Sequence, residues 1–388
     1  MLTNAVAPDK LGGLERYVRE LSAALVRKGI PVTVLAKRMR EEDPTDEVGD
    51  DGVRIVRHRV PSKCDRTFAA RYPFSVAAGV VREVRRIGPY GIIHGHYAIT
   101  TLPVALMTRP FLYSFHAPVH KELLLEHGGS YLLPEVTRTT AVRSLRAAER
   151  RVVTRASGTV VVSEFSRAQL GELSTRAAGN SQLIAGGVDT ERFSPGQVRR
   201  DEWARSADPL IFTARRLVAR TGVFELVQAM PLILTRLPMA QLAIAGDGHQ
   251  RGAIEDEIRR LGIEKSVRLL GRVVDAELLQ WYRSADLSVT PTQMLEGFGL
   301  STGESLAVGT PVLVTPIGAN PELVRNLNPL LVAPGRRPAD LAQAILRLVE
   351  QEGLLNRLRA PARSRAHPRW SWDHVSDRYL ELYKLFMP

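Results

Sequence analysis

Two glutamates flank a glycine-rich turn in the second half of the chain. Glu296 and Glu304 bound the segment Glu-Gly-Phe-Gly-Leu-Ser-Thr-Gly-Glu. Its glycines let backbone approach a ligand closely, and amides at the start of a following helix can bind a phosphate or sugar hydroxyl groups. One carboxylate before the turn and one inside the helix can reach opposite ends of the same ligand. An exposed turn with two solvated glutamates explains the pattern equally well.

Two other patterns are weaker indications of a functional site. His94-Gly-His96 puts two imidazoles on one face of a strand without further clustered ligands, so a structural or acceptor-side role for His96 is favoured over a metal site. The segment Gly246-Asp-Gly-His-Gln-Arg-Gly252 imitates a dinucleotide fingerprint, but the next strand ends without the acidic residue that a ribose contact needs. The chain contains no Asp-x-Asp sequence, and we predict no metal site.

The first half of the chain predicts one amphipathic helix and several short buried strands. Residues 13–28 form the helix, with Gly29 where a C-terminal cap belongs. Only residues 1–4 precede the following loop, so the first strand is either very short or begins upstream. The apolar stripe of the helix is Leu14, Tyr17, Val18, Leu21 and Leu25. Continuous apolar runs, typical of parallel strands buried on both faces, lie at 32–36, 91–94, 111–115 and 159–162.

The second half alternates strands and helices more regularly. Helices are predicted at 250–261, before Gly262, and at 276–284, with Asp275 as the N-cap. Alternation in both halves predicts an α/β protein with two doubly wound parallel sheets. The predicted strands are 210–213, 242–245, 267–270, 287–289, 311–314 and 330–332.

Composition and punctuation divide the chain into two domains. A length of 388 residues is large for one core and suits two. A polar stretch with prolines at its edges marks the linker, and a last helix at 373–386 follows the Pro-Arg-Trp-Ser-Trp segment. The predicted parts are an N-terminal acceptor-side domain at 1–195, a linker at 196–208, a nucleotide-sugar-binding domain at 209–367 and a returning C-terminal helix at 368–388.

The net charge of +12 does not indicate nucleic-acid binding, because aromatic residues make up only 6% of the chain. The densest basic segment, 138–155, carries apolar residues at helical spacing. We interpret it as a surface helix with one solvated face. Attraction to anionic lipid or to an acidic acceptor is the alternative.

The sequence favours a cytoplasmic protein, with a peripheral contact at the inner face of the membrane as a further expectation. No apolar run approaches the ~18 residues that cross a bilayer, and the N-terminus lacks the pattern of a signal peptide. Cys64 is the only cysteine, which excludes an intrachain disulfide and a four-cysteine zinc site.

The paired glutamates resemble the signature of retaining glycosyltransferases of the GT-B fold, the group 1 type of family four. Further segments match that family's order and spacing over nearly the whole chain. They are Gly12-Gly13, Ser114-Phe-His116, Val161-Val-Ser163, Gly186-Gly-Val-Asp-Thr-Glu-Arg-Phe193, Ala214-Arg-Arg-Leu217, Ala245-Gly-Asp-Gly248 and Gly309-Thr-Pro311. The resemblance implies an α/β GT-B architecture of two Rossmann-like doubly wound domains that face a cleft.

The resemblance also implies how a nucleotide diphosphate sugar is bound. Glu304 is expected to accept hydrogen bonds from the ribose hydroxyls, and Glu296 to hold hydroxyls of the donor sugar. Arg216 is expected to neutralise the diphosphate as the sugar bond breaks. The expected backbone contacts beside Glu296 come from Phe298, Gly299 and Leu300.

The remaining family positions complete the expected site. His116 is placed beside the donor sugar, so the catalytic candidates are His116, Glu296 and Arg216. The loop of Gly12 and Gly13 is expected to close over the phosphates. The list of donor contacts is completed by Gly246 and Asp247, which border the nucleotide at the end of a strand.

One position departs from the family. A lysine usually follows the arginine by five residues as a second diphosphate cation, whereas this chain has Thr221 there. Arg220 and Arg215 are the candidates to replace it, and the donor contacts therefore include Arg220.

Together these features predict a metal-independent, retaining transferase of the hexosyltransferase type, without a cofactor. It moves a sugar from a nucleotide diphosphate to a glycan, a glycolipid or a small-molecule acceptor. The family implies that the leaving diphosphate takes the acceptor proton on the same face of the sugar. A sugar-nucleotide epimerase of the same fold and a catalytically degenerate nucleotide-sugar binder are the alternatives. Donor base, donor sugar, acceptor and oligomeric state stay open.

Overall fold

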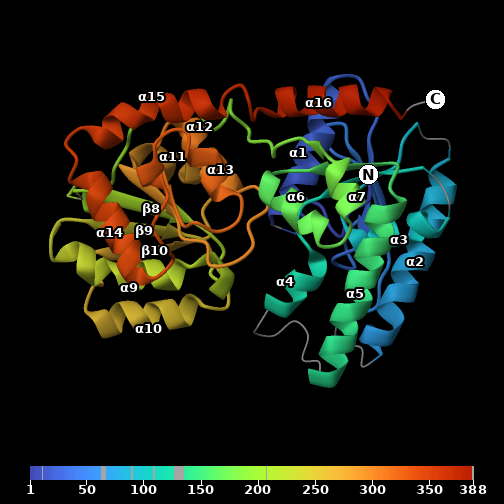
Figure 1. The fold of residues 1–388 in the computed structure, drawn as a ribbon, viewed down its shortest axis with the longest axis horizontal. Helices are drawn as coiled ribbons and strands as arrows, with labels where there is room; N and C mark the ends of the chain where they lie inside the picture. The colour runs from blue at the N-terminus through green and yellow to red at the C-terminus, as the bar shows by residue number, and fades with distance from the viewer. Residues whose placement is uncertain are drawn as a thin grey trace. The chain divides into compact units, whose positions relative to one another are not determined.

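The computed structural model describes residues 1–10, 12–62, 67–88, 91–107, 110–125, 135–206 and 208–386. The chain forms two compact units, one of Met1–Gly187 with Trp372–Pro388 and the other of Val188–Ser371. Each unit contains parallel strands with helices packed around them (Figure 1). The predicted α/β class with parallel sheets is confirmed.

The strands of the first unit form two groups joined by the start of the chain. The Leu2 amide donates to the carbonyl of His94 (2.8 Å), and the Leu35 amide donates to the carbonyl of Met1 (2.8 Å). Leu2 bridges Leu35 on one side and Gly95 on the other, both in parallel, and so connects the two groups. One group has the order β1 (Thr33–Lys37), β3 (Arg54–His58) and β2 (Asp46–Val48), of which β2 is antiparallel. The other is parallel in the order β4 (His94–Gly95), β5 (Leu112–Phe115), β6 (Gly158–Val161) and β7 (Gln182–Leu183).

The helices of the first unit cover these strands. Helices α2, α3 and α5 lie side by side, whereas α1 packs against α16 (Figure 1). In α1 the predicted stripe is buried at Tyr17, Val18, Leu21 and Leu25. The helices are α1 (Gly13–Arg27), α2 (Phe68–Ile87), α3 (Ala98–Leu106), α4 (Val119–Leu125), α5 (Glu135–Arg155), α6 (Glu164–Gly171), α7 (Thr175–Gly179) and α16 (Trp372–Lys384).

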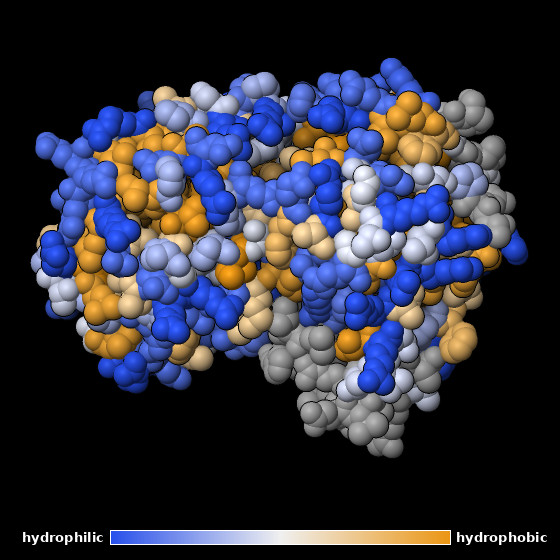
Figure 2. All heavy atoms as spheres, viewed as in Figure 1, coloured by the Kyte–Doolittle hydropathy of each residue, from blue (hydrophilic) through white to orange (hydrophobic). Residues whose placement is uncertain are grey.

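The basic segment predicted as a surface helix belongs to α5. Val152 and Val153 are buried, while the arginines at 143, 146, 150 and 151 are exposed. This arrangement confirms one apolar and one solvated face. Hydrophilic side chains spread over most of the visible surface, interrupted by smaller apolar areas (Figure 2). No helix in the described part of the chain has the length and apolar composition of a membrane span.

The second unit contains one parallel sheet whose strand order reverses beside β8. Its order is β10 (Val267–Gly271), β9 (Gln241–Ala245), β8 (Leu210–Ala214), β11 (Leu287–Thr290) and β12 (Val312–Val314). The chain moves outward from β8 through β9 to β10, and then returns to the other side of β8 with β11. Ligands of open α/β sheets bind at such a reversal, outside the carboxyl ends of the strands. The loops after β8 and β11 therefore occupy the expected binding edge.

Helices cover both faces of this sheet. Helices α9, α10 and α14 lie on one side, and α11, α12 and α15 on the other (Figure 1). The helical segments are α8 (Glu202–Arg205), η1 (Ala219–Thr221), α9 (Val223–Leu234), α10 (Arg251–Leu261), α11 (Asp275–Ser284), α12 (Leu300–Val308), α13 (Asn320–Val324), η2 (Pro329–Leu331), α14 (Pro338–Val349) and α15 (Leu354–Ala366).

Two local predictions were wrong. Of the strand expected at 330–332, Leu330 and Leu331 lie in a 3₁₀ turn, because Pro329 occupies its first turn and the Asn328 side chain accepts a hydrogen bond from the Leu330 amide (2.9 Å). Only Val332 pairs as predicted, in a parallel bridge with Val314. Asp275 is the first residue of α11 rather than its N-cap, which is Val274.

Residues 188–208 belong to the second unit, although part of this stretch was expected as a linker. The Val188 amide donates to the carbonyl of Trp370 (2.7 Å). Arg200 donates to the carboxylate of Asp286 (2.8 Å) and to the carbonyl of Ser284. These bonds attach the segment to other parts of the second unit.

A buried polar network attaches α16 to the first unit. The Tyr379 hydroxyl lies 2.8 Å from the hydroxyl of Tyr17 and 2.9 Å from that of Ser114. His94 contacts Ser114 through Nε2 (2.8 Å) and Tyr383 through Nδ1 (2.7 Å). Because buried polar groups require partners, these bonds connect α1, β4 and β5 to the last helix.

We expect Tyr379→Phe to destabilise the first unit. The substitution leaves the hydroxyls of Tyr17 and Ser114 without a shared buried partner, a cost of about 1–3 kcal/mol. Urea unfolding should show a lower midpoint. Arg378→Ala, at a more exposed position of the same helix, is the matched control and should leave the midpoint nearly unchanged. Equal midpoints for the unmodified protein and Tyr379→Phe would contradict a stabilising role for the network.

Candidate active site

The end of β8 and the end of β9 are joined by backbone hydrogen bonds. The Arg215 amide donates to the carbonyl of Ala245 (2.9 Å), and the Leu217 amide donates to that of Asp247 (3.0 Å). Gly246 has a φ of 135°, and a Cβ there would lie 1.9 Å from the carbonyl oxygen of Arg215. Only glycine fits, so this residue brings the two loops together. Its predicted contact with a nucleotide, and that of Asp247, stay predictions.

Glu296 forms an ion pair with Arg215 across the strand reversal. Arg215 Nη2 donates to Glu296 Oε2 at 2.6 Å, and their side chains are only 9% and 16% exposed. Arg215 also donates to the hydroxyls of Thr292 and Ser301, both at 3.2 Å. The loop after β8, the loop after β11 and the start of α12 therefore meet at one guanidinium group.

The charge of Glu296 is stabilised by neighbouring arginines. Burial acts to raise the pKa of Glu296, but Arg215 and Arg220, with a smaller effect from Arg216, outweigh it and hold the pKa below the ordinary glutamate value. Glu296 is consequently a carboxylate at neutral pH, able to accept hydrogen bonds.

The three residues of the predicted diphosphate site have different surroundings. The Arg216 side chain is exposed, as a ligand-binding cation requires. Thr221 is buried, and its hydroxyl donates to the carbonyls of Arg216 (2.6 Å) and Val218 (2.7 Å). Thr221 thus holds the η1 turn. Arg220 is partly buried and donates from Nη1 to the carbonyl of Leu295 (3.3 Å).

Glu304 lies within α12, which begins at the glycine-rich turn. Gly299 is left-handed (φ 93°), and a Cβ there would lie 2.1 Å from the Asn320 side chain. The first intrahelical bond runs from the Gly303 amide to the Gly299 carbonyl (2.9 Å), so earlier amides, including that of Leu300, are available to a ligand. Glu304 is buried and accepts a hydrogen bond from the Tyr282 hydroxyl (3.2 Å).

Phe298, the aromatic residue of the turn, is buried. Its ring meets that of Trp370 edge to face, with 5.7 Å between the ring centroids. The structure therefore gives the Phe298 side chain a packing role and leaves its backbone for the predicted ligand contact.

His116 lies directly after β5 in the first unit. Its Nε2 is 3.2 Å from Nδ1 of His96, and the Tyr17 ring meets it edge to face at 4.6 Å. Burial lowers the pKa of His116 to about 3. His116 is therefore a neutral hydrogen-bonding group at neutral pH. Within the described ranges, no three His, Cys, Asp or Glu side chains gather closely enough to hold a metal ion.

Gly12 and Gly13 begin α1, with Gly12 as the N-cap in an extended conformation. A Cβ on Gly12 would lie 2.3 Å from the carboxylate of Glu15, which also accepts a hydrogen bond from Lys10 (2.6 Å). The carboxylate of Glu15 therefore folds back over the start of the helix, and a larger residue at position 12 would displace it.

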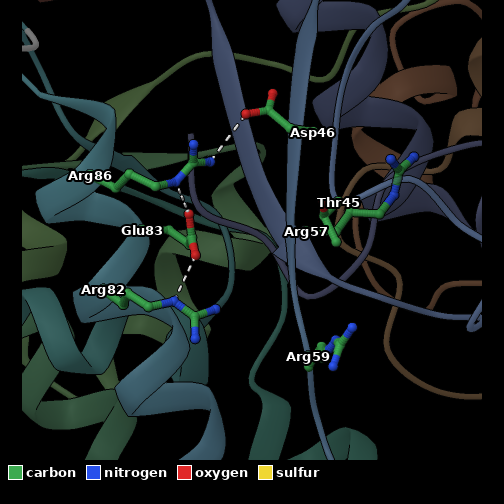
Figure 3. A pocket seen from close by; sticks show the side chains of 7 residues that line it. All are labelled: Thr45, Asp46, Arg57, Arg59, Arg82, Glu83 and Arg86. Atoms are coloured by element: carbon green, nitrogen blue, oxygen red, sulfur yellow. Dashed lines mark hydrogen bonds and ion pairs between the residues drawn. The ribbon is translucent and has the colours of Figure 1, made fainter.

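A separate pocket of about 350 Å³ in the first unit contains none of the predicted site residues. Glu83 accepts hydrogen bonds from Arg82 (2.8 Å) and Arg86 (2.5 Å), and Arg86 also reaches Asp46 at 3.1 Å (Figure 3). Much of the positive charge of this pocket is therefore paired with its own carboxylates. The lining residues are Thr45, Asp46, Arg57, Arg59, Arg82, Glu83 and Arg86.

The structure assigns the predicted residues to both units. Those of the first unit are Gly12, Gly13 and His116. Those of the second are Arg216, Arg220, Gly246, Asp247, Glu296, Phe298, Gly299, Leu300 and Glu304. Sequence reasoning missed the supporting residues Tyr282, Thr292, Ser301 and Asn320, since single hydroxyl and amide residues gave no signal.

Models of two protein families match consecutive parts of the chain. Glycosyltransferase Family 4 matches residues 11–192, and Glycosyl transferases group 1 matches residues 197–365. The chain belongs to the group 1 glycosyltransferases. The second match contains both glutamates and both arginines of the predicted donor site.

Similar proteins extend over the full length of this glycosyltransferase. An uncharacterized glycosyltransferase of Methanocaldococcus jannaschii is 25% identical, covering 100% of this chain and 98% of its own. A D-inositol 3-phosphate glycosyltransferase of Corynebacterium urealyticum is 27% identical, covering 96% and 90%. The Anabaena protein HepE, solved with UDP-glucose, has a TM-score of 0.74 and 18% identity, covering 99% of both chains. The predicted GT-B fold with two Rossmann-like domains is confirmed.

The lowered pKa of Glu296 predicts a pH-dependent contribution to stability. A carboxyl group with a lower pKa in the folded state stabilises the fold above its ordinary pKa of 4.5, and this contribution is lost as pH falls through the lowered value. The difference in unfolding free energy between the unmodified protein and Glu296→Gln should be about 1–3 kcal/mol at pH 7 and shrink below pH 4.5. Urea titrations at several pH values measure it. Glu264→Gln, at an exposed position of the same unit, is the control, and a difference independent of pH would contradict the ion pair.

Proposed function

We propose that this glycosyltransferase transfers a sugar from a nucleotide diphosphate sugar to an acceptor, with retention at the anomeric carbon and without a metal ion. The observation that carries the proposal is the arrangement at the strand reversal of the second unit. There Glu296, Glu304 and the start of α12 share one sheet edge with the exposed Arg216.

Each group of this arrangement suits one part of a donor. Glu304 is a hydrogen-bond acceptor for the vicinal ribose hydroxyls, and Glu296 for the sugar hydroxyls. Arg216 and Arg220 supply positive charge to the diphosphate, and the first amides of α12 add the positive end of a helix. HepE, a solved protein of the same fold, binds UDP-glucose, which supports a nucleotide sugar as the donor class.

The acceptor side of the proposal rests on the first unit. His116 of the same unit is proposed to lie beside the donor sugar; it is neutral, its Nε2 contacts His96, and its Nδ1 has no hydrogen bond from the described residues. The loop at Gly12 and Gly13 is proposed to contact the phosphates. A glycan, a glycolipid or a small molecule is the acceptor class, and a cytoplasmic location with peripheral membrane contact is part of the proposal.

The proposed chemistry requires no dedicated protein base. The bond between the anomeric carbon and the diphosphate oxygen breaks, and the acceptor oxygen bonds to the anomeric carbon on the same face. The acceptor proton passes to an oxygen of the leaving diphosphate. Arg216 stabilises the charge that develops on this leaving group.

Donor turnover in a chelator tests the proposal. We expect labelled UDP-glucose or ADP-glucose to release free sugar slowly in EDTA. In a second test, we expect Glu304→Ala to weaken the affinity for the nucleoside diphosphate about tenfold or more, because the ribose hydroxyls lose a charged acceptor. Calorimetry and chromatography provide the measurements. A changed sugar would instead indicate an epimerase, and binding without turnover a degenerate binder. Turnover that stops in EDTA and returns with manganese would contradict the metal-independent route.

The second diphosphate cation can be assigned by comparing two arginines. Thr221 is buried in the η1 turn, so we expect Arg220 to supply this charge. Arg220→Ala should then slow sugar release nearly as much as Arg216→Ala, with a larger effect on kcat than on donor affinity, because leaving-group charge peaks in the transition state. Arg259→Ala, at an exposed position of the same unit, is the control. A normal kcat in Arg220→Ala would show that Arg216 acts alone.

A further inference from the structure

Two consecutive arginines at the end of β8 have opposite environments. The Arg216 side chain is exposed, whereas that of Arg215 is only 9% exposed and is directed at Glu296. Successive side chains of an extended segment point to opposite sides, which accounts for the difference. The two residues therefore cannot perform the same task, although both carry a guanidinium group.

Arg215 is held by several contacts within the second unit. Nη2 donates to Glu296 Oε2 at 2.6 Å and to the Thr292 hydroxyl at 3.2 Å, while Nη1 donates to the Ser301 hydroxyl at 3.2 Å. Its Nε is buried and has no hydrogen-bond partner within the described residues. Both terminal nitrogens are thus engaged by the protein. This engagement argues against Arg215 as the replacement diphosphate cation.

The backbone around Glu296 is fixed independently of the side chain. The Glu296 carbonyl accepts a hydrogen bond from the Ala319 amide (2.9 Å), and a Cβ on Gly318 would lie 2.7 Å from the Cβ of Glu296. The preceding residue, Leu295, has a φ of 45°, and Arg220 donates to its carbonyl. The main remaining freedom of Glu296 is rotation of its side chain, and Arg215 restricts that rotation.

We propose that Arg215 is a positioning residue for donor-sugar specificity. By engaging Oε2 of Glu296, it directs Oε1 toward the hydroxyls of the sugar. The ion pair occupies Oε2, which leaves Oε1 as the oxygen that accepts from the sugar. The proposal deepens the proposed function and rests on it, because it assumes that Glu296 binds the sugar of the donor.

The same ion pair explains why a buried carboxylate can serve in this position. An isolated carboxylate at a largely buried site is costly and tends to take up a proton. The protonated group would offer a donor as well as acceptors and would read a different pattern of hydroxyls. Arg215 therefore controls both the direction and the protonation state of the group that contacts the sugar.

A double-mutant cycle separates positioning from direct ligand contact. The variants are Arg215→Gln, Glu296→Gln and the double variant, with Arg215→Lys as the conservative change. The double variant replaces the ion pair by two amides and guards against misfolding from a single unpaired buried charge. Calorimetry measures the Kd of each variant for UDP and for UDP-glucose. Arg251→Gln is the matched control, because it breaks another Arg–Glu pair of this unit, that with Glu255.

We expect Arg215→Gln to raise the Kd for UDP-glucose about tenfold while the Kd for UDP changes by less than about twofold. Glu296→Gln should lose the same affinity for UDP-glucose. The double variant should lose no more, since both substitutions remove the same interaction between Glu296 and the sugar. Arg215→Lys should recover part of the affinity. Equal losses for UDP and UDP-glucose would overturn the proposal and make Arg215 a diphosphate ligand. Fully additive losses would also overturn it.

Failure of the proposed function gives a different result. If the unmodified protein binds neither UDP-glucose nor ADP-glucose, the donor role fails, and the Glu296 carboxyl is then titrated by NMR in the unmodified protein and in Arg215→Gln. A higher pKa in the variant would support the positioning of Glu296 by Arg215. An unchanged pKa would overturn it.

Discussion

The proposed donor site depends on backbone segments that approach each other too closely for side chains. At the carboxyl edge of the second sheet, a Cβ on Gly222 would lie 1.7 Å from the carbonyl oxygen of Pro291, and one on Gly246 would lie 1.9 Å from that of Arg215. These contacts fix the loop after β8 against its neighbours on both sides. The arginines and glutamates of the site are therefore carried on a rigid edge, as a preorganised site requires.

The charged residues in this region differ in burial. Arg215 and Glu296 form a largely buried ion pair and neutralise each other, while the Arg216 side chain is exposed. Without Arg215, the negative charge of Glu296 would neutralise part of the positive charge that the other arginines offer to a diphosphate. In the proposed donor site, this pairing would leave the positive charge of Arg216 for the diphosphate.

Sequence patterns predicted the second sheet and the glutamate turn well, because buried parallel strands and glycine-rich turns leave strong local signals. The strand predicted at 330–332 was mostly wrong, since the apolar run hid the effect of Asn328 and Pro329, which start the 3₁₀ turn η2. Only Val332 pairs with β12. The pairing of Arg215 with Glu296 could not be predicted from the sequence either. Its partner Glu296 lies 81 residues away, and only the strand order brings them together.

The first unit showed a similar limit. The helix at the start of the chain could be predicted from its apolar stripe, but nothing in that stripe identifies Tyr379 as the partner of Tyr17. Residues near the linker were also difficult, because hydrogen bonds from Val188 and Arg200, rather than composition, decide which unit they join.

The return of α16 to the first unit has a consequence for biosynthesis. When the ribosome has delivered the first 187 residues, the hydroxyls and imidazole that later contact Tyr379 and Tyr383 have no such partners, and Trp372 is absent from its place beside Gly187. Domains generally fold as units during synthesis, and the second unit is complete in sequence before α16 emerges. The first unit therefore cannot make its last contacts until the whole second unit has been synthesised, whichever unit begins to fold first.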